Sequence, residues 1–145
     1  PASLPVEIFE SAQHGELQKV VKWLGKEGSV DALCSAPDTV GETSDFGLLH
    51  GAAGCGHLEL VRELLKRGAS VDLPYSLGGT ALMDAASLGH LSVVLVLLQH
   101  SASIDLQSSL GGTALMNAFF ICVSSLYIAA PARADRYARH VAFTL

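Results

Sequence analysis

The sequence contains the eight residues SLGGTALM twice, first at 76–83 and again thirty-three positions later at 109–116. The similarity extends further, because residues 47–73 align without a gap on residues 80–106 at the same shift. Similarity at a fixed period of about 20 to 50 residues is typical of chains built from stacked supersecondary units. The sequence therefore predicts an array of repeated units in place of a single global core.

One repeated unit, taken over 79–106, has the pattern of two helices joined by a tight turn. Thr80 is placed to cap a short first helix whose small residues permit close packing. Gly89 is expected to end that helix in a left-handed turn. The second helix is expected over 91–99, and an extended hairpin then leads to the next unit. The apolar stripe of the second helix is predicted to consist of Leu91, Val94, Leu97 and Leu98.

A weaker copy precedes these units at a shift of forty-one, with Gly15 aligned on Gly56 and Asp31 on Asp72. The eight additional residues, 41 against 33, fall in the segment 33–45, which is rich in Pro, Gly, Ser, Thr and Asp and is expected to be an inserted loop. The predicted domain covers 6–118 and is followed by a non-repeat C-terminal segment, 119–145. Its units are predicted at about 6–32, 46–73 and 79–106, with a partial unit at 112–118.

These units resemble the ankyrin repeat family, whose pattern G-x-T-P-L-H-x-A-A-x-x-G-H is nearly matched by GGTALMDAASLGH and partly by FGLLHGAAGCGH. The second-helix pattern and the Gly-Ala ending reappear in LELVRELLKRGASVD. The resemblance implies an all-α fold, a helical solenoid of about three to four helix-turn-helix units with projecting hairpins and an irregular C-terminal segment. The positions that depart from the family pattern are Gly47, Ala81, Met83, Ser101, Ala114 and Met116.

The family pattern stops after Ala118, where FFICVSSLYIAAP replaces the expected Ala-x-x-Gly-His. Residues 119–130 are mostly apolar but fall short of the roughly 20 residues of a membrane-spanning helix, so a buried or docking helix is expected. Two interpretations of 119–145 remain open: an irregular cap on the last unit, or sequence not native to the family, for instance from an altered reading frame. One hypothesis is docking near Leu95 and Val96, where the preceding unit carries charged residues.

The composition and the first residues of the sequence argue against a nucleic-acid partner and against a secreted protein. The chain has 145 residues, half of them hydrophobic, and a net charge of −5. This acidic balance argues against nucleic acid, which is bound mainly through clustered Lys and Arg. Cys34, Cys55 and Cys122 are widely spaced without a CxxC pair, which favours reduced thiols. The first residues show no secretory signal, so a cytoplasmic or nuclear protein is expected, and whether the chain is a fragment stays open.

The residues closest to a chemical site are His50, Cys55 and His57. A zinc site needs four convergent ligands and no fourth is evident, so each histidine is expected to hydrogen-bond to backbone groups instead. A Cys55 nucleophile with His57 as its base would also need an orienting group and an oxyanion site. Asp72 and Asp105 recur at the repeat period, which favours a hairpin role over a catalytic pair. No catalytic activity, metal or cofactor is therefore expected.

The inserted segment 33–45 is the remaining candidate for regulation. It contains Ser35, Thr39, Thr43 and Ser44 among acidic residues. Phosphorylation or partner binding there is a hypothesis, and a solvated loop without a specific function is the simpler interpretation.

The resemblance implies a non-catalytic, monomeric module that binds another protein through its hairpin tips and the concave face of its first helices. Tyr75 is interpreted as an exposed anchor, whereas Leu77 and Leu110 serve equally well as packing residues between hairpins. The alternative is a targeting or regulatory domain of a larger enzyme or channel. The identity of the partner is not encoded in any motif. The residues that the resemblance assigns to partner binding are Tyr75, Ser76, Leu77, Asp84, Ser87, Leu88, Ser108, Ser109, Leu110 and Asn117.

Overall fold

The computed structural model of this chain describes residues 3–26, 28–37 and 43–119. The labelled helices are α1 (Val6–Gln13), α2 (Leu17–Leu24), α3 (Leu48–Gly54), α4 (Leu58–Lys66), α5 (Ala81–Ser87) and α6 (Leu91–Gln99). The strands are β1 (Leu33–Pro37) and β2 (Thr43–Gly47). A further helical segment lies at 114–119. Within this part of the chain, every helix falls short of the length and apolar character that crossing a membrane requires.

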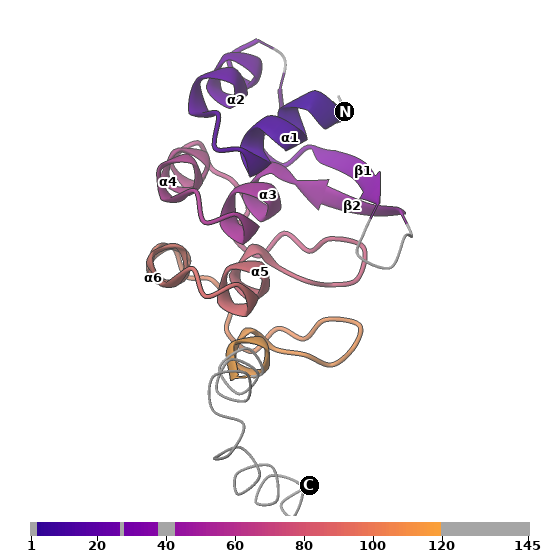
Figure 1. Cartoon of the computed structure of the whole chain (residues 1–145), viewed down its shortest axis with the longest axis vertical. Coiled ribbons are helices and arrows are strands. Elements are labelled where there is room, and N and C mark those ends of the chain that lie inside the picture. Colours follow the sequence, from indigo (N-terminus) through magenta and orange to yellow (C-terminus); the bar gives the residue numbers. More distant parts are fainter. Residues whose placement is uncertain (1–2, 27, 38–42, 120–145) are drawn as a thin grey trace, which may run out of the picture.

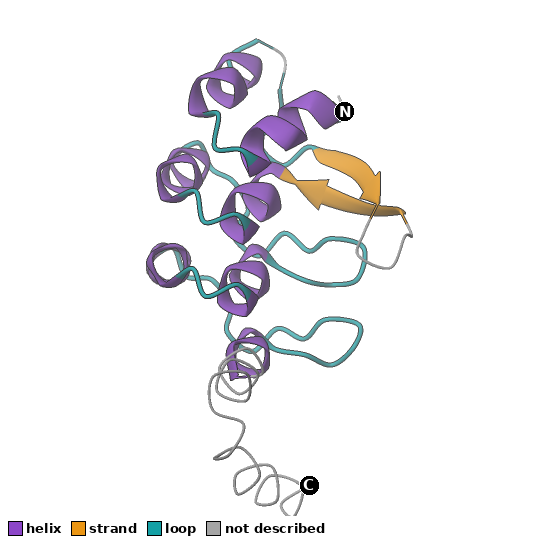
Figure 2. Ribbon diagram, in the orientation of Figure 1, coloured by secondary structure: helices purple, strands orange, loops and turns teal. Residues whose placement is uncertain are grey.

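The helices form pairs that stack in chain order along the long axis of the molecule (Figure 1). The first helices α1, α3 and α5 make one column, and the second helices α2, α4 and α6 make another. The hairpins project from the side of the first helices (Figure 2). The segment 114–119 continues the first-helix column. This arrangement confirms the predicted helical repeat.

Two strands occupy much of the segment that was expected to be an inserted loop. β1 and β2 pair antiparallel, with Leu33 opposite Gly47 and Pro37 opposite Thr43. The longer insertion provides additional backbone N–H and C=O groups, and pairing them with one another satisfies them. The prediction of an all-α fold is therefore wrong at this hairpin. The described fold is a helical repeat that carries a small two-stranded sheet.

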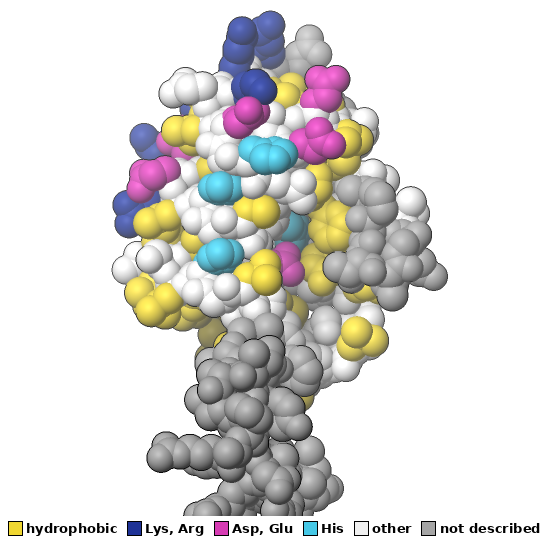
Figure 3. All heavy atoms as spheres, viewed as in Figure 1, with side chains coloured by type: hydrophobic (Ala, Val, Ile, Leu, Met, Phe, Trp, Pro, Cys, Tyr) yellow, Lys and Arg dark blue, Asp and Glu magenta, His cyan; other side chains and the backbone are white. Residues whose placement is uncertain are grey.

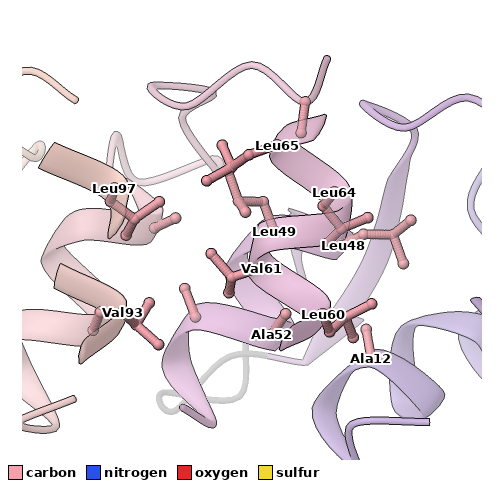
Figure 4. Packing of buried hydrophobic residues seen from close by; sticks show 14 of the residues in the cluster. Ala12, Leu48, Leu49, Ala52, Leu60, Val61, Leu64, Leu65, Val93 and Leu97 are labelled. Atoms are coloured by element: carbon pink, nitrogen blue, oxygen red, sulfur yellow. The ribbon is translucent and has the colours of Figure 1, made fainter. Parts of the chain in front are cut away.

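The core is a cluster of buried apolar side chains that runs between successive helix pairs (Figure 4). Ala52 on α3 and Ala85 on α5 are completely buried, and their small size lets neighbouring first helices approach closely. Leu60 and Leu64 on α4 and Leu97 on α6 fill the space between the two columns. Each pair of helices thus buries its apolar face against its neighbours in the stack.

The buried face of α6 differs from the predicted stripe. The buried residues of α6 are Val93, Val96 and Leu97. Leu91 and Leu98, which were expected on the buried stripe, are exposed. Leu95 faces solvent as expected, but Val96 belongs to the core, so the predicted outward pair is divided between the two environments. The exposure of Leu91 and Leu98 results from their position at the end of the stack of described units.

The histidine after each turn glycine ties one unit to the unit before it. Nε2 of His57 donates to the backbone carbonyl of Gln13 at 2.7 Å. Nε2 of His90 donates to the carbonyl of Gly54, the equivalent position one unit later, at 2.9 Å. The predicted backbone role of these histidines is confirmed. The bonds fix the register of each turn against its neighbour.

The aspartate near the end of each unit makes a second repeated link. The carboxylate of Asp31 accepts hydrogen bonds from the backbone N–H and the hydroxyl of Ser70, at 2.8 and 2.5 Å. Asp72 accepts the same pair of bonds from Ser103, at 2.9 and 2.5 Å. The hairpin role predicted for Asp72 is therefore confirmed. Asp105 occupies the same position in the last unit and is exposed.

The partial unit predicted at 112–118 forms a first helix that extends to Phe119. The hydroxyl oxygen of Thr113 lies 3.3 Å from the backbone nitrogen of Met116, as that of Thr80 lies 3.4 Å from the nitrogen of Met83. The predicted threonine cap is therefore present in both units. Except for Phe119, the segment predicted as non-repeat sequence lies outside the described residues.

We expect a reciprocal effect of exchanging the residues that come after α4 and α6. Ser101 has a φ of 64° and Gly68 at the equivalent position has 86°, both in the left-handed region that glycine tolerates best. A Cβ atom at Gly68 would meet no atom within 4 Å, so only the positive φ should make glycine and serine differ in stability at this position. Ser101→Gly should raise the free energy of unfolding by about 0.5 to 1 kcal/mol, and Gly68→Ser should lower it by a similar amount. Urea denaturation measures both, and a loss of stability in Ser101→Gly would contradict the explanation.

Candidate functional site

The residues expected to bind a partner fall into two groups by their position in the fold. One group lies in the hairpins that come after α4 and α6, and the other lies in the first-helix column. Figure 2 shows that the hairpins extend beyond the first helices on one side of the stack. The hairpin group is Tyr75, Ser76, Leu77, Ser108, Ser109 and Leu110. The helix group is Asp84, Ser87, Leu88 and Asn117.

Tyr75 is half-buried in an aromatic cluster and is not the exposed anchor expected from the sequence. Its ring centroid lies 5.0 Å from that of Phe46 and 5.7 Å from that of His50, which it meets edge-on. Phe46 in turn stacks on Phe9 of α1 at 5.9 Å. The ring of Tyr75 also covers Gly79, where any Cβ atom would collide with it. Tyr75 therefore joins its hairpin to the β1–β2 hairpin and to α3.

Neighbouring hairpins are also joined by hydrogen bonds through three of the expected site residues. The hydroxyl of Ser76 accepts from the backbone N–H of Asp45 in β2 at 2.8 Å. The carbonyl of Leu77 accepts from the N–H of Ser109 in the next hairpin at 2.8 Å. These groups hold the hairpins side by side. Leu110, at the tip of the last described hairpin, is 91 % exposed and is the best placed of the group to meet a partner.

Asp84 in the middle of α5 has an unusual environment for a carboxyl group. Its side chain is half-buried, and its carboxyl group has no hydrogen-bond or ion-pair partner in the described part of the chain. Burial raises the pKa of Asp84 to about 7, because desolvation disfavours the charged form. The next turn carries Ser87, whose hydroxyl donates to the Asp84 carbonyl at 2.9 Å, and the exposed side chain of Leu88. A titratable group and an apolar group thus lie one turn apart on the same column.

The position of Asp84 recurs in the other units, where it is occupied by Glu10, Gly51 and Asn117. Glu10 was not among the expected site residues, although the forty-one-residue shift aligns it with this column. It lines a cleft of about 370 Å³ over α1 and α2 together with Glu7, Ile8, Ser11, His14, Glu16 and Lys19. Figure 3 shows acidic side chains at this end of the face, with Lys and Arg side chains beside them. The first-helix column therefore carries a carboxyl group on α1 and another on α5, and Gly51 of α3 occupies the equivalent position between them.

The three residues weighed as a metal or catalytic cluster have separate structural roles. His50 Nδ1 accepts from the N–H of Gly47 at 3.0 Å and Nε2 donates to the carbonyl of Leu73 at 2.7 Å, which fixes a neutral ring. Burial lowers the pKa of His50, in keeping with that neutral form. Partial desolvation raises the pKa of the Cys55 thiol, which disfavours a thiolate nucleophile. No group of three metal-ligating side chains converges among the residues that the structure describes.

The β1–β2 hairpin positions some of the residues considered for phosphorylation or partner binding. The hydroxyl of Ser35 donates to the carboxylate of Asp45 across the strands at 2.6 Å. Ser44 is buried, whereas Thr43 is exposed. Thr39 lies outside the described residues. Of the candidates in the described strands, Thr43 and Ser35 are thus the accessible ones, and a regulatory role for either stays a hypothesis.

We expect Tyr75→Ala to lower the melting temperature, because the substitution removes the ring that connects two hairpins. The free energy of unfolding should fall by about 1 to 3 kcal/mol, less than for a fully buried aromatic residue. Leu110→Ala is the matched control at a hairpin tip, and its effect should stay within about 0.5 kcal/mol. Thermal melts followed by circular dichroism measure both variants. If Tyr75→Ala melts with the wild type, the ring is not part of the scaffold.

Comparison with known families supports this assignment of residues to a repeat. The family described as ankyrin repeats (3 copies) matches residues 8–108. The matched range begins in α1 and ends in the hairpin after α6, so it contains three successive helix pairs. No curated protein matches the sequence. The match covers more than half of the chain and agrees with the thirty-three-residue period and the repeated histidine and aspartate bonds, so this chain belongs to the ankyrin repeat family.

Proposed function

We propose that this chain is a non-catalytic module that binds a protein partner along its first-helix column and its hairpin tips. Ankyrin repeats are generally protein–protein interaction modules and are typically without catalytic activity. A stack of repeats provides an extended surface for a partner, because each unit presents equivalent positions side by side. The free thiols Cys34 and Cys55 fit a reducing compartment such as the cytoplasm or nucleus.

Asp84 is the observation that carries the proposal. A half-buried carboxyl group without a partner lowers the stability of the free protein, since its charged form lacks compensation. A lysine or arginine of a bound protein would supply that compensation and would lower the pKa of Asp84 by favouring its charged form. Glu10, at the equivalent position of α1, extends the acidic character along the column. We therefore propose that the partner presents basic side chains to this column.

Leu88 and Leu110 provide the apolar part of the proposed surface. Both side chains are exposed, Leu88 beside Asp84 at the end of α5 and Leu110 at a hairpin tip. Exposed large side chains next to a polar group that needs a partner are typical of the centre of an interface. Tyr75 is left out of this surface as an anchor, because its ring is engaged within the scaffold. Its effect on binding would be indirect, through the position of the hairpin.

The proposal is tested by affinity capture from cell extract with the immobilised chain, followed by titration of the captured protein against purified variants. At pH 8, Asp84→Asn should weaken binding by about tenfold, because it removes a charge that contacts a basic group. Lowering the pH to 6 should weaken binding by the wild type, since Asp84 with a pKa of about 7 becomes neutral. The Asp84→Asn variant should not show this part of the pH dependence.

Leu88→Asp and Leu95→Asp form the matched pair of controls for that titration. Both place an aspartate at an exposed leucine, but Leu88 lies on the first-helix column and Leu95 on the outward side of α6. Leu88→Asp should reduce binding, whereas Leu95→Asp should leave it unchanged. Equal binding by all variants would show that the partner uses another surface, and identical pH profiles for wild type and Asp84→Asn would remove Asp84 from the contact.

A further inference from the structure

The same Leu-Met pair, within an identical sequence of two successive units, has opposite exposure in this structure. The residues TALM occur at 80–83 and again at 113–116. In the first copy Leu82 and Met83 are 2 and 3 % exposed, and a further described helix follows them in the stack. In the second copy Leu115 and Met116 are 78 and 58 % exposed. The difference lies in the absence of a described neighbour, since the local sequence is the same.

The second-helix column shows the same difference at its end. Leu98 on α6 is 39 % exposed, whereas Leu65 at the equivalent position of α4 is 7 % exposed. Leu91 is exposed as well, while the equivalent Leu58 packs against the core. In Figure 1, α6 and the segment after it lie at the end of the described stack. We refer to Leu91, Leu98, Leu115 and Met116 as the C-terminal end face.

Leu95 shows that this exposure is specific to the end of the stack. Its equivalent in α4 is Arg62, whose side chain is exposed although a complete unit comes after α4. Leu95 therefore faces outward whether or not a further unit is present. The four end-face residues differ, because their equivalents in the preceding units, Leu58, Leu65, Leu82 and Met83, are buried or packed against the core. The end face thus consists of positions that are buried or packed against the core in a unit when another unit follows it in the stack.

We propose that residues 120–130 of this chain cover the C-terminal end face. The segment begins directly after Phe119, which ends the last described helix and is itself exposed. Its sequence is FICVSSLYIAA, in which nine of eleven residues are apolar. Two apolar surfaces that are joined without a linker remove each other from water when they pack together. The proposal does not depend on which protein the first-helix column binds.

The repeat alignment supports this occupant. At the thirty-three-residue shift, Leu126 takes the place of Val93 and Ala130 that of Leu97, both of which are buried in α6. Apolar residues therefore recur where a covering second helix needs them. The smaller side chain at position 130 fills less space than Leu97, so the cover differs from a regular helix pair in its packing.

Two residues of this segment that align with the turn between the helices also depart from the preceding units. Cys122 stands where Gly89 has a φ of 75°, a conformation that is costly for a residue with a side chain. Val123 replaces His90, so the bond to a preceding carbonyl cannot be made by this residue. The proposed cover is consequently an irregular one, which explains why the family pattern stops at Ala118 although an apolar segment continues.

A second copy of the chain is the competing occupant. Two copies that paired through their end faces would leave residues 120–130 of both chains without a covering surface. A directly attached segment also acts at an effective concentration in the millimolar range, about a thousandfold above a protein at micromolar concentration. The intramolecular cover is therefore favoured at ordinary protein concentrations.

Hydrogen exchange of the full chain, measured by mass spectrometry, tests the cover. Peptides from 120–130 should exchange at least about tenfold more slowly than an unstructured chain. Leu115→Asp should abolish this protection, because it places a charge on the end face, while the matched control Leu95→Asp should retain it. Leu126→Asp should in turn speed the exchange of 114–119. Peptides from α3 and α5 report whether the repeats remain folded in each variant.

Three results would overturn the proposal. The first is wild-type exchange of 120–130 at the rate of an unstructured chain. The second is equal loss of protection in Leu95→Asp and Leu115→Asp. The third is protection that increases with protein concentration together with dimer formation in analytical ultracentrifugation, which would assign the end face to a second copy. If Leu115→Asp unfolds the repeats, the Leu126→Asp variant tests the proposal instead, because its substitution leaves the sequence of the described units unchanged. Exchange of 114–119 at the wild-type rate in Leu126→Asp would then overturn the proposal.

Discussion

The packing of each helix pair on its neighbour is the contact on which the rest of this structure depends. Helices of seven to nine residues are too short to be stable alone in water, and one pair cannot enclose its own apolar residues. The fully buried Ala52 and Ala85 let successive first helices approach, and the histidine and aspartate bonds fix the register between units. Stability is therefore a property of the stack, and the last described unit exposes side chains whose equivalents the preceding unit buries.

The same packing positions the candidate binding surface. Because the hairpins are joined to one another through Tyr75, Ser76 and Leu77, their tips are held in a fixed relation to the first helices. Asp84 lies on a helix whose residues Ala81, Leu82, Met83 and Ala85 are buried, so the packing of α5 fixes the place from which its side chain extends. A surface of this kind is organised before a partner arrives, which limits the entropy lost on binding.

The repeat period allowed much of the fold to be predicted from sequence. A shift of thirty-three residues aligns the turn glycines and the residues that bond across units, so the roles of His57 and Asp72 could be predicted from their recurrence. The β1–β2 hairpin was not predicted, because the polar composition of its segment also describes a loop. No periodic signal distinguishes the two, since strand pairing there depends on residues across the insertion.

The environments of individual site residues were harder to predict than the fold. Tyr75 was expected to be exposed because it is larger and more apolar than a turn requires. Its aromatic partner, Phe46, belongs to the preceding hairpin and has no fixed relation to it in the repeat pattern. The exposure of Leu91 and Leu98 depends on the neighbour that the next part of the stack provides, which their own helix does not encode. The position of Asp84 was predictable from the resemblance, but its burial and raised pKa arise from packing between units.

Native-state hydrogen exchange at increasing low concentrations of urea tests the dependence on neighbouring units most directly. Each amide then reports the free energy of the opening that exposes it. If stability arises from contacts between units, amides of α3, which has a helix pair on each side, should show the highest opening free energy, and amides of 114–119 the lowest. One common opening free energy for all units, or the highest value at 114–119, would contradict this account.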